Sequence, residues 1–320
     1  MQNKALNYGR GEYELPSDTV DVEATRIELT QWLDGFLARP TCELPRPPQV
    51  ALEVLALSKK PNARIEDIAS VLEREPLLAG RVLKLANSAL YGGGVACVTL
   101  KQALVRMGLA IVRDVVMEAA MQMTVIHAEG LNATLESIRR HSSAVAWISR
   151  FVARNTSIDA ENAFLVGLLH DVGMSYALIA LAEFARIHRK PARLDAASWL
   201  AVESVHERFS EHVLSSWGLP PSVSIVPGHH HTLMMGGRPH PQVAVLIVAE
   251  QLAADAKWNV RPVVEQGDDG IAFSPGAESS SRDETERALK VLDLTQRHYE
   301  LVQKDTQRVL ETLAGQFKTK

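Results

Sequence analysis

The sequence has few of the features that mark several classes of protein. Cysteine occurs only twice in 320 residues, at Cys42 and Cys97, which excludes a disulfide framework and favours a reducing compartment. Aromatic residues make up 5% of the chain, whereas leucine, alanine and valine are abundant, and this balance favours helices over a β-sandwich. The first residues, 1–18, lack the apolar core of a signal peptide. The longest apolar runs, near 164–169 and 243–248, are too short to span a bilayer.

Positive charge is not in excess either. The chain has 34 lysines and arginines against 38 aspartates and glutamates, so its formal net charge is -4. Such a chain has no broad positive field with which to hold a polyanion. We therefore expect no nucleic acid and no membrane among its partners, and a cytoplasmic location.

Apolar residues recur at helical spacing along most of the chain, and strand-like alternation is rare. Thr99 followed by Gln102 has the pattern of a capping box, and Gly108 is expected to end the helix that begins there. Asn87 and Ser88 are interpreted as groups that satisfy a helix end. The fold class is therefore predicted to be all-α, with helices near residues 25–38, 65–72, 76–91, 100–108, 111–126, 135–154, 160–186, 197–216, 241–256 and 284–317.

Breaks in this pattern divide the chain into four predicted parts. A polar stretch at 127–134 separates two helical halves, and residues 267–283 are rich in glycine, serine and aspartate, as flexible loops are. The four parts are an N-terminal extension with a helix (1–35), a helical part (36–128), a second helical part with most of the histidines (132–260), and a loop followed by a C-terminal helix (261–320).

Ionisable side chains interrupt the apolar faces of several predicted helices. Some fill a gap in an apolar stripe, one pair ends an apolar run, and three histidines follow a loop rich in proline and glycine. The residues that fill gaps in apolar stripes are His141, His206 and Glu250. The pair that ends an apolar run is His170-Asp171, and the three histidines after the loop are His229–His231. Each histidine alone is best interpreted as a core residue that hydrogen-bonds to a backbone carbonyl. Together they favour a shared site, because buried imidazoles and carboxylates are normally paired or bind a metal. Without thiolates, this set suits Fe, Mn or Zn and does not resemble a structural zinc site.

The chain also resembles a known family. The order of His141, His170-Asp171, His206, His230-His231 and Glu250 is similar to that of the HD superfamily of metal-dependent phosphohydrolases. The run Asn87-Ser88-Ala89-Leu90-Tyr91-Gly92 and the run Trp217-Gly218-Leu219-Pro220 resemble the HDOD domain, the HD-related output domain of bacterial signalling proteins. The resemblance covers about residues 36–256. It implies an all-helical fold in which an N-terminal helical part packs on an HD-like bundle.

The resemblance also implies a set of metal ligands and one or two divalent ions, with Asp171 able to bridge two of them. The implied ligands are His141, His170, Asp171, His206, His230, His231 and Glu250. The last acidic ligand of the family is usually aspartate, and Asp255 is a second candidate for it here. Pro227-Gly228 would break the helix that normally carries the two adjacent histidines, so the register within His229–His231 stays open by one residue.

Two functions follow from the resemblance, and a third interpretation stays open. The first is a signalling regulator that acts through contacts with a protein partner, with the metal supporting structure or the sensing of a phosphorylated small molecule. The alternative is a metal-dependent phosphohydrolase acting on a nucleotide or other phosphoester, with Asp171 in its catalytic centre. Residues 172–174 lack the lysine of the cyclic-dinucleotide phosphodiesterases, and their Gly-Tyr-Pro run is absent, so we do not expect that activity. In the third, His141 and His206 only hydrogen-bond inside the core.

Overall fold

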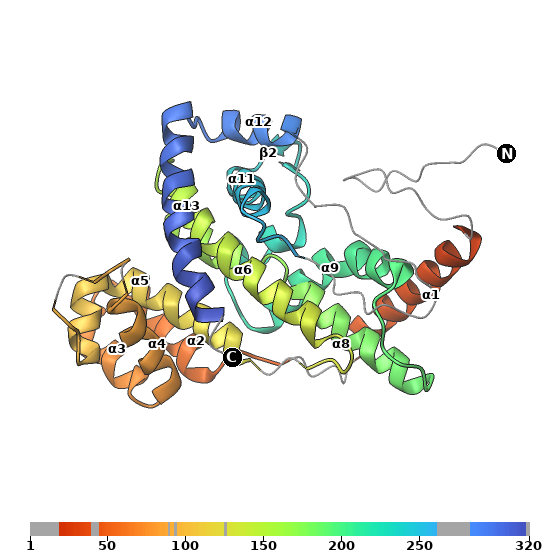
Figure 1. The fold of residues 1–320 in the computed structure, drawn as a ribbon, viewed down its shortest axis with the longest axis horizontal. Coiled ribbons are helices and arrows are strands. Elements are labelled where there is room, and N and C mark those ends of the chain that lie inside the picture. Colours follow the sequence, from red (N-terminus) through yellow and green to blue (C-terminus); the bar gives the residue numbers. More distant parts are fainter. Residues whose placement is uncertain are drawn as a thin grey trace. The chain divides into compact units, whose positions relative to one another are not determined.

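The computed structural model describes residues 19–39, 45–88, 90–92, 95–124, 127–260 and 282–317, and almost all of their regular structure is helical (Figure 1). This confirms the predicted all-α fold. The only strands in the described part of the chain form a two-residue antiparallel hairpin. The elements are α1 (Thr19–Leu37), α2 (Gln49–Ser58), α3 (Ile65–Leu72), α4 (Pro76–Ala86), α5 (Leu100–Met123), α6 (Asn132–Ala153), α7 (Ala160–Leu169), α8 (Val172–Ile187), α9 (Ala196–Ser216), α10 (Pro221–Ser224), the 3-10 turn η1 (Val226–Gly228), β1 (Met234–Met235), β2 (Arg238–Pro239), α11 (Pro241–Asp255), α12 (Arg282–Val291) and α13 (Gln296–Phe317).

The described residues belong to two compact units. The larger unit takes its residues from 1–44 and 126–303, and the smaller takes its residues from 45–125 and 304–320. Helix α13 contributes to both, because the division falls between Gln303 and Lys304. The predicted division of the chain into four parts stays a prediction. Of the loop predicted at 267–283, residues up to 281 lie outside the described residues, and the last two residues belong to α12.

In the smaller unit, α5 packs against α2, α3 and α4. Its first turn is closed by the predicted capping box: the Thr99 hydroxyl accepts the Gln102 N–H at 3.2 Å, and the Gln102 side-chain oxygen accepts the Thr99 N–H at 3.2 Å. Pro76 occupies the first turn of α4, where its missing N–H leaves no helix bond unmade. Cys97 is buried with a free thiol, and Cys42 lies outside the described residues.

The Asn87 side chain holds together the turn after α4. Its oxygen accepts the Cys97 N–H at 2.7 Å, and its amide donates to the Cys97 carbonyl at 2.9 Å and to the Leu83 carbonyl at 3.0 Å. Arg106 donates to the Ala86 carbonyl at 3.1 Å. The Asn87 side chain therefore bonds to a backbone carbonyl at the end of α4, which confirms that it satisfies groups at a helix end.

The predicted break at Gly108 is confirmed: its φ of 78° and ψ of 160° are not helical, and α5 is kinked there into one helical segment before Gly108 and one after it. A prediction further along the chain is wrong. The helix predicted over 284–317 is broken between α12 and α13. There Asp293 has a φ of 51°, and the Leu294 N–H bonds back to the Leu289 carbonyl, which is the hydrogen-bond pattern of a helix C-terminus.

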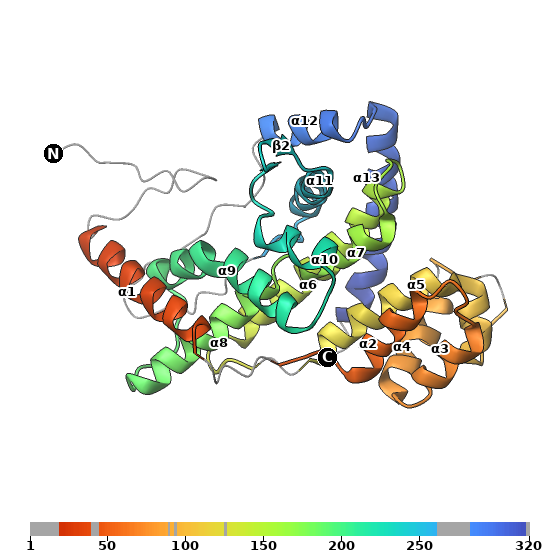
Figure 2. The ribbon, with the colours of Figure 1, turned by 180° about the vertical axis from the view of Figure 1, so that it is seen from behind.

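In the larger unit, α6 packs on α7, α8 packs on α9, and α11 packs on α6 (Figures 1 and 2). Helix α1 lies along α9 and α8. Its Trp32 indole donates to the Ala180 carbonyl at 3.2 Å, and its Asp34 pairs with Arg208 at 2.7 Å. Gly167 allows the close approach of α7 and α6, because a Cβ atom there would lie 2.7 Å from the Ser149 hydroxyl.

The stretch Ala160–Ile187, which contains α7 and α8, is long and apolar enough to cross a membrane by length and composition alone. However, 94% of its most apolar window is buried in the structure. Burial in a protein core accounts for this apolar character, because a helix at the centre of a core is apolar on all sides.

Candidate metal centre

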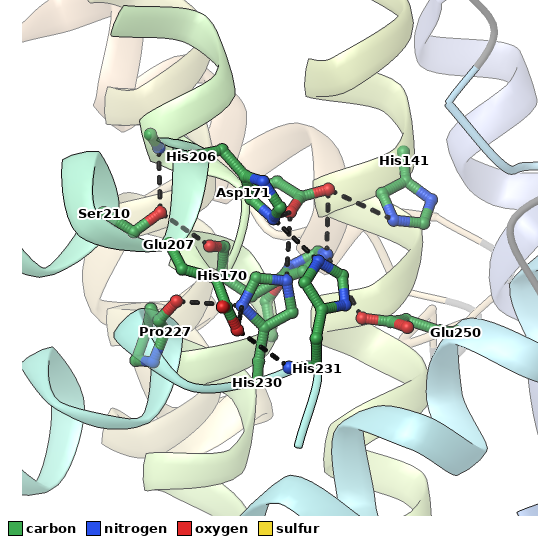
Figure 3. A network of polar contacts seen from close by, with 12 residues as sticks. His141, His170, Asp171, His206, Glu207, Ser210, Pro227, His230, His231 and Glu250 are labelled. Atoms are coloured by element: carbon green, nitrogen blue, oxygen red, sulfur yellow. Dashed lines mark hydrogen bonds and ion pairs between the residues drawn. The ribbon is translucent and has the colours of Figure 1, made fainter. Parts of the chain in front are cut away.

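Seven polar side chains from five segments of the larger unit meet at one buried centre (Figure 3). Most of these side chains are buried, and only His231 is intermediate in exposure. They are His141 from α6, His170 and Asp171 from the turn between α7 and α8, His206 from α9, His230 and His231 from the loop after η1, and Glu250 from α11. The structure therefore brings together the seven residues that the resemblance implied as metal ligands.

Asp171 lies at the middle of this cluster. Its Oδ2 atom lies 3.2 Å from His170 Nε2 and 3.7 Å from His141 Nε2. Its Oδ1 atom lies 3.3 Å from His230 Nε2 and 3.8 Å from His206 Nε2. Each carboxylate oxygen thus faces its own pair of imidazoles, which is the arrangement that a carboxylate bridging two ions requires.

Four of the histidines are oriented in the same way, by a hydrogen bond from Nδ1 to a backbone carbonyl. The distances are 2.9 Å from His141 to Trp258, 2.8 Å from His170 to Gly167, 2.6 Å from His206 to Glu203, and 2.8 Å from His230 to Pro227. Because a carbonyl only accepts, the ring must carry its proton on Nδ1, which leaves the Nε2 lone pair of the neutral ring for the centre. Backbone carbonyls orient metal-binding histidines in this way.

Three atoms at the centre are buried without a hydrogen-bond partner. They are His170 Nε2, His230 Nε2 and Asp171 Oδ1. Buried polar atoms in folded proteins are normally bonded, and those left over call for a water or an ion. The donors that could share an ion lie within 4.8 Å of one another in three overlapping groups: His141 with His170 and Asp171, His170 with His230 and Glu250, and His206 with His230 and His231. Imidazole and carboxylate donors at this spacing fit Fe, Mn or Zn.

Burial and charge move the pKa values within the cluster in opposite directions. Burial alone would lower the pKa of His170, but the adjacent Asp171 carboxylate and Glu250 raise it to about 9. Burial raises the pKa of Asp171, yet His170 and His230 outweigh it and hold that pKa well below its ordinary value. Burial lowers the pKa of both His141 and His206. Without a metal, His170 and Asp171 therefore form a buried ion pair beside His141 and His206, whose lowered pKa values favour the neutral ring.

A break in the helical chain, between α7 and α8, places His170 and Asp171 at the centre. The sequence predicts one helix over 160–186, and this is wrong, because α7 ends at Leu169 and α8 begins at Val172. The reason is a tertiary contact: the Ser210 hydroxyl of α9 donates to the His170 carbonyl at 2.8 Å and accepts the Gly173 N–H at 2.9 Å. These two bonds satisfy backbone groups that a continuous helix would pair internally.

The structure also resolves two questions that the sequence left open. His230 is buried with its ring at the centre, His231 lies beside His206 with their Nε2 atoms 2.8 Å apart, and His229 is exposed. Glu250 is buried, with Oε1 at 3.8 Å from His170 Nε2. Asp255 is exposed and accepts a hydrogen bond from Gln251 one turn earlier, so it is not part of the cluster.

Residues that orient the cluster were missed by sequence reasoning. Ser210 interrupts the apolar stripe of α9 one turn after His206, and that gap was a usable signal. Glu207 accepts the His231 N–H at 3.0 Å, but a partly exposed glutamate in a helix gives no sequence signal. Trp258 acts through its carbonyl group, which every residue has.

The fold and the cluster together define a class: all-helical proteins with a buried group of histidines and carboxylates at their centre. Residues 44–233, more than half of the chain, match the family model of the HDOD domain, and the chain belongs to the HDOD family. The match includes six of the seven cluster residues, and Glu250 on α11 lies beyond its end.

Three solved structures share the fold. One is a candidate metal-dependent phosphohydrolase from Shewanella amazonensis SB2B, with a TM-score of 0.63 and 18% identity, covering 88% of this chain and 99% of that chain. Another is an HDOD domain protein with unknown function from Geobacter sulfurreducens, with a TM-score of 0.60 and 18% identity, covering 91% and 96%. A third is a candidate signal transduction protein from Marinobacter aquaeolei VT8, with a TM-score of 0.60 and 17% identity, covering 92% and 66%. At these identities the likeness shows the fold alone.

A curated relative is also similar in sequence. An uncharacterized protein of Treponema pallidum (strain Nichols) is 23% identical over 220 residues, which is 63% of this chain and 40% of that protein. The match thus spans less than half of the relative.

Proposed function

We propose that this protein is a bacterial signalling regulator whose buried centre binds one or two divalent ions and which acts through contacts with a protein partner. The proposal that a metal binds here rests on one observation: several buried polar atoms around Asp171 lack hydrogen bonds. His170 Nε2 and His230 Nε2 face opposite oxygens of that carboxylate, and their Nδ1 atoms are already bonded to backbone carbonyls. A bound ion would satisfy these buried atoms, which have no hydrogen bonds within the folded chain.

The cluster has enough donors for two positions that share Asp171. His141 and His170 would hold one ion, with Glu250 beside His170, and His206, His230 and His231 would hold the other. A divalent ion supplies positive charge and Lewis acidity at such a centre. Here the residues would supply imidazole nitrogens, a carboxylate shared between the two positions, and a buried surrounding.

Access to the centre favours the regulator over an enzyme. The central atoms His170 Nε2, His230 Nε2 and Asp171 Oδ1 are closed off from solvent, so a phosphoester could not reach them without a rearrangement. The turn after Asp171 continues as Val172-Gly173-Met174, all buried and without the cation that would meet a phosphoryl group. The solved relative that is named for signal transduction agrees with this ranking.

The second candidate is a metal-dependent phosphohydrolase, with a nucleotide or other phosphoester as substrate and Asp171 in its catalytic centre. The completeness of the donor set favours it, as does the name of the Shewanella relative. We rank it second because of the closed centre. A cytoplasmic location, a phosphorylated small-molecule ligand, and the absence of nucleic acid and membrane from the partners remain part of the proposal.

The metal content of the purified protein tests the proposal directly. We expect one or two equivalents of Fe, Mn or Zn in the wild type by elemental mass spectrometry, and none in the double variant His170→Ala/Asp171→Ala. His212→Ala is the matched control, because His212 is an exposed histidine of α9 outside the cluster, and it should keep the metal. A wild type that stays free of metal after purification with added Mn²⁺ or Fe²⁺ would contradict the metal proposal.

The same preparations separate the two candidate functions. We expect the metal-loaded wild type to hydrolyse generic phosphoesters and cyclic dinucleotides no faster than the double variant does. Hydrolysis that is lost in Asp171→Ala while the circular dichroism spectrum is kept would reverse the ranking.

A further inference from the structure

The loop that carries His230 and His231 has little regular structure of its own. Pro227 has no N–H to donate, η1 is a single 3-10 turn, and β1 begins only three residues after His231. No helix periodicity sets which histidine faces the centre. Contacts with neighbouring elements must therefore set the register of this loop.

Helix α9 provides these contacts through Glu207, the residue after His206. The Glu207 Oε1 atom accepts the backbone N–H of His231 at 3.0 Å and lies 3.8 Å from His230 Nδ1 (Figure 3). The Glu207 side chain is 31% exposed, so most of its surface is covered by the protein. One carboxylate thus contacts the backbone of one histidine and the ring of the histidine before it.

The loop approaches α9 closely at a second point. A Cβ atom on Gly228 would lie 2.9 Å from Cβ of Glu211, one turn after Glu207. Glycine at this position lets the chain run close enough for the His231 N–H to reach Glu207. The result is that His231 and His206, held by the same stretch of α9, have their Nε2 atoms 2.8 Å apart.

We infer that Glu207 is a positioning residue that sets the register of His230 and His231 and thereby completes the second of the two ion positions. This inference rests on the proposed metal centre. The first position takes its donors from α6 and the turn between α7 and α8, whereas Glu207 contacts His230 and His231 in the loop after η1. Glu207 should therefore govern one ion and leave the other in place.

The charge of Glu207 has a separate effect from its hydrogen bond. A carboxylate near Nδ1 of a metal-binding histidine makes the ring a stronger donor, and loss of such a partner weakens metal affinity about 10–100-fold. Glutamine keeps an oxygen that can accept the His231 N–H but removes the charge. Alanine removes both.

The experiment compares Glu207→Ala and Glu207→Gln with the wild type and with the control variant Arg208→Ala. In the wild type the Arg208 side chain bonds to Asp34 on α1. Each protein is titrated with Mn²⁺ by calorimetry. We expect two ions in the wild type and Arg208→Ala. Glu207→Ala should keep one ion and lose the other, or bind it at least ~10-fold more weakly. Glu207→Gln should regain the second ion with an intermediate affinity.

Amide hydrogen exchange of the metal-free proteins provides a readout that does not depend on binding. The His231 amide should exchange faster in Glu207→Ala than in the wild type, and slowly again in Glu207→Gln. Unchanged stoichiometry, affinity and exchange in Glu207→Ala would overturn the role of Glu207 and leave the metal centre standing. A wild type that binds no Mn²⁺ would overturn the metal centre and this role with it, whereas loss of both ions in Glu207→Ala would overturn the selectivity for one position.

Discussion

At the scale of single residues, the centre is governed by one carboxylate and the imidazoles around it. His170 and Asp171 are adjacent in sequence and buried, and His170 Nε2 lies 3.2 Å from Asp171 Oδ2. In the absence of a metal the two side chains therefore stabilise each other as an ion pair. His141 and His206 lie next to the same carboxylate, but burial keeps them neutral. The cluster therefore holds a proton that a metal ion would have to displace.

The metal-free protein should be most stable near pH 6.5. The folded-state pKa of His170 is raised from 6.5 to about 9, so its contribution to the free energy of unfolding is complete below 6.5 and is lost as the pH rises toward 9. The pKa values of His141 and His206 are lowered from 6.5, so stability also falls as the pH drops below 6.5. Urea unfolding after chelation, from pH about 5 to about 10, measures this curve.

The variant His170→Asn is the control for the alkaline limb. Asparagine does not titrate, so the loss of stability between pH 6.5 and about 9 should disappear. A wild type whose urea midpoint stays constant over that interval would contradict the buried ion pair.

At the scale of elements, the centre depends on the close approach of α8 and α9. A Cβ atom on Gly173 would lie 2.0 Å from the His206 carbonyl oxygen and 2.5 Å from the Ser210 backbone nitrogen. Backbone atoms cannot rotate away as a flexible side chain can. Gly173 is thus required for the packing that brings the turn at His170 and Asp171 against the helix that carries His206.

Gly173→Ala should destabilise the protein by about 2–3 kcal/mol, because the added methyl group forces α8 and α9 apart. Gly80→Ala is the matched control: Gly80 lies inside α4, a Cβ atom there would meet nothing within 4 Å, and alanine should stabilise that helix by about 0.5–1 kcal/mol. Thermal unfolding followed by circular dichroism measures both. Equal melting temperatures for the two variants would show that the approach of α8 and α9 can relax.

At the scale of the whole molecule, an ion at the centre would tie together segments that are far apart along the chain. His141 and Glu250 are separated by more than a hundred residues, yet both lie at one buried centre of the larger unit. A ligand that binds only the folded state stabilises it, by about 2.7 kcal/mol when its free concentration is 100 times its Kd.

Removal of the metal should therefore lower the melting temperature of the wild type by about 5–10 °C, given the usual dependence of melting temperature on stability for a unit of this size. Differential scanning calorimetry before and after treatment with a chelator measures the shift. The double variant His170→Ala/Asp171→Ala should show no shift with chelator. A wild type that melts at the same temperature in both conditions would count against a bound ion.

Local sequence patterns determined much of the molecule. Helical spacing of apolar residues predicted the all-α fold, Thr99 with Gln102 predicted the start of α5, and the gaps in apolar stripes at His141 and His206 identified two members of the cluster. These features could be predicted because caps and amphipathic faces depend on residues a few positions apart.

Other features were decided only by contacts between distant segments. The helix broken at His170 and Asp171 depends on Ser210, about forty residues later in the chain, and its own sequence reads as one continuous apolar helix. The register of His230 and His231 depends on Glu207 in the same way. The local pattern of apolar residues determines which face of each helix is buried. The hydrogen bonds that break a helix or hold a loop come from side chains far away in the sequence, and only folding brings these side chains close.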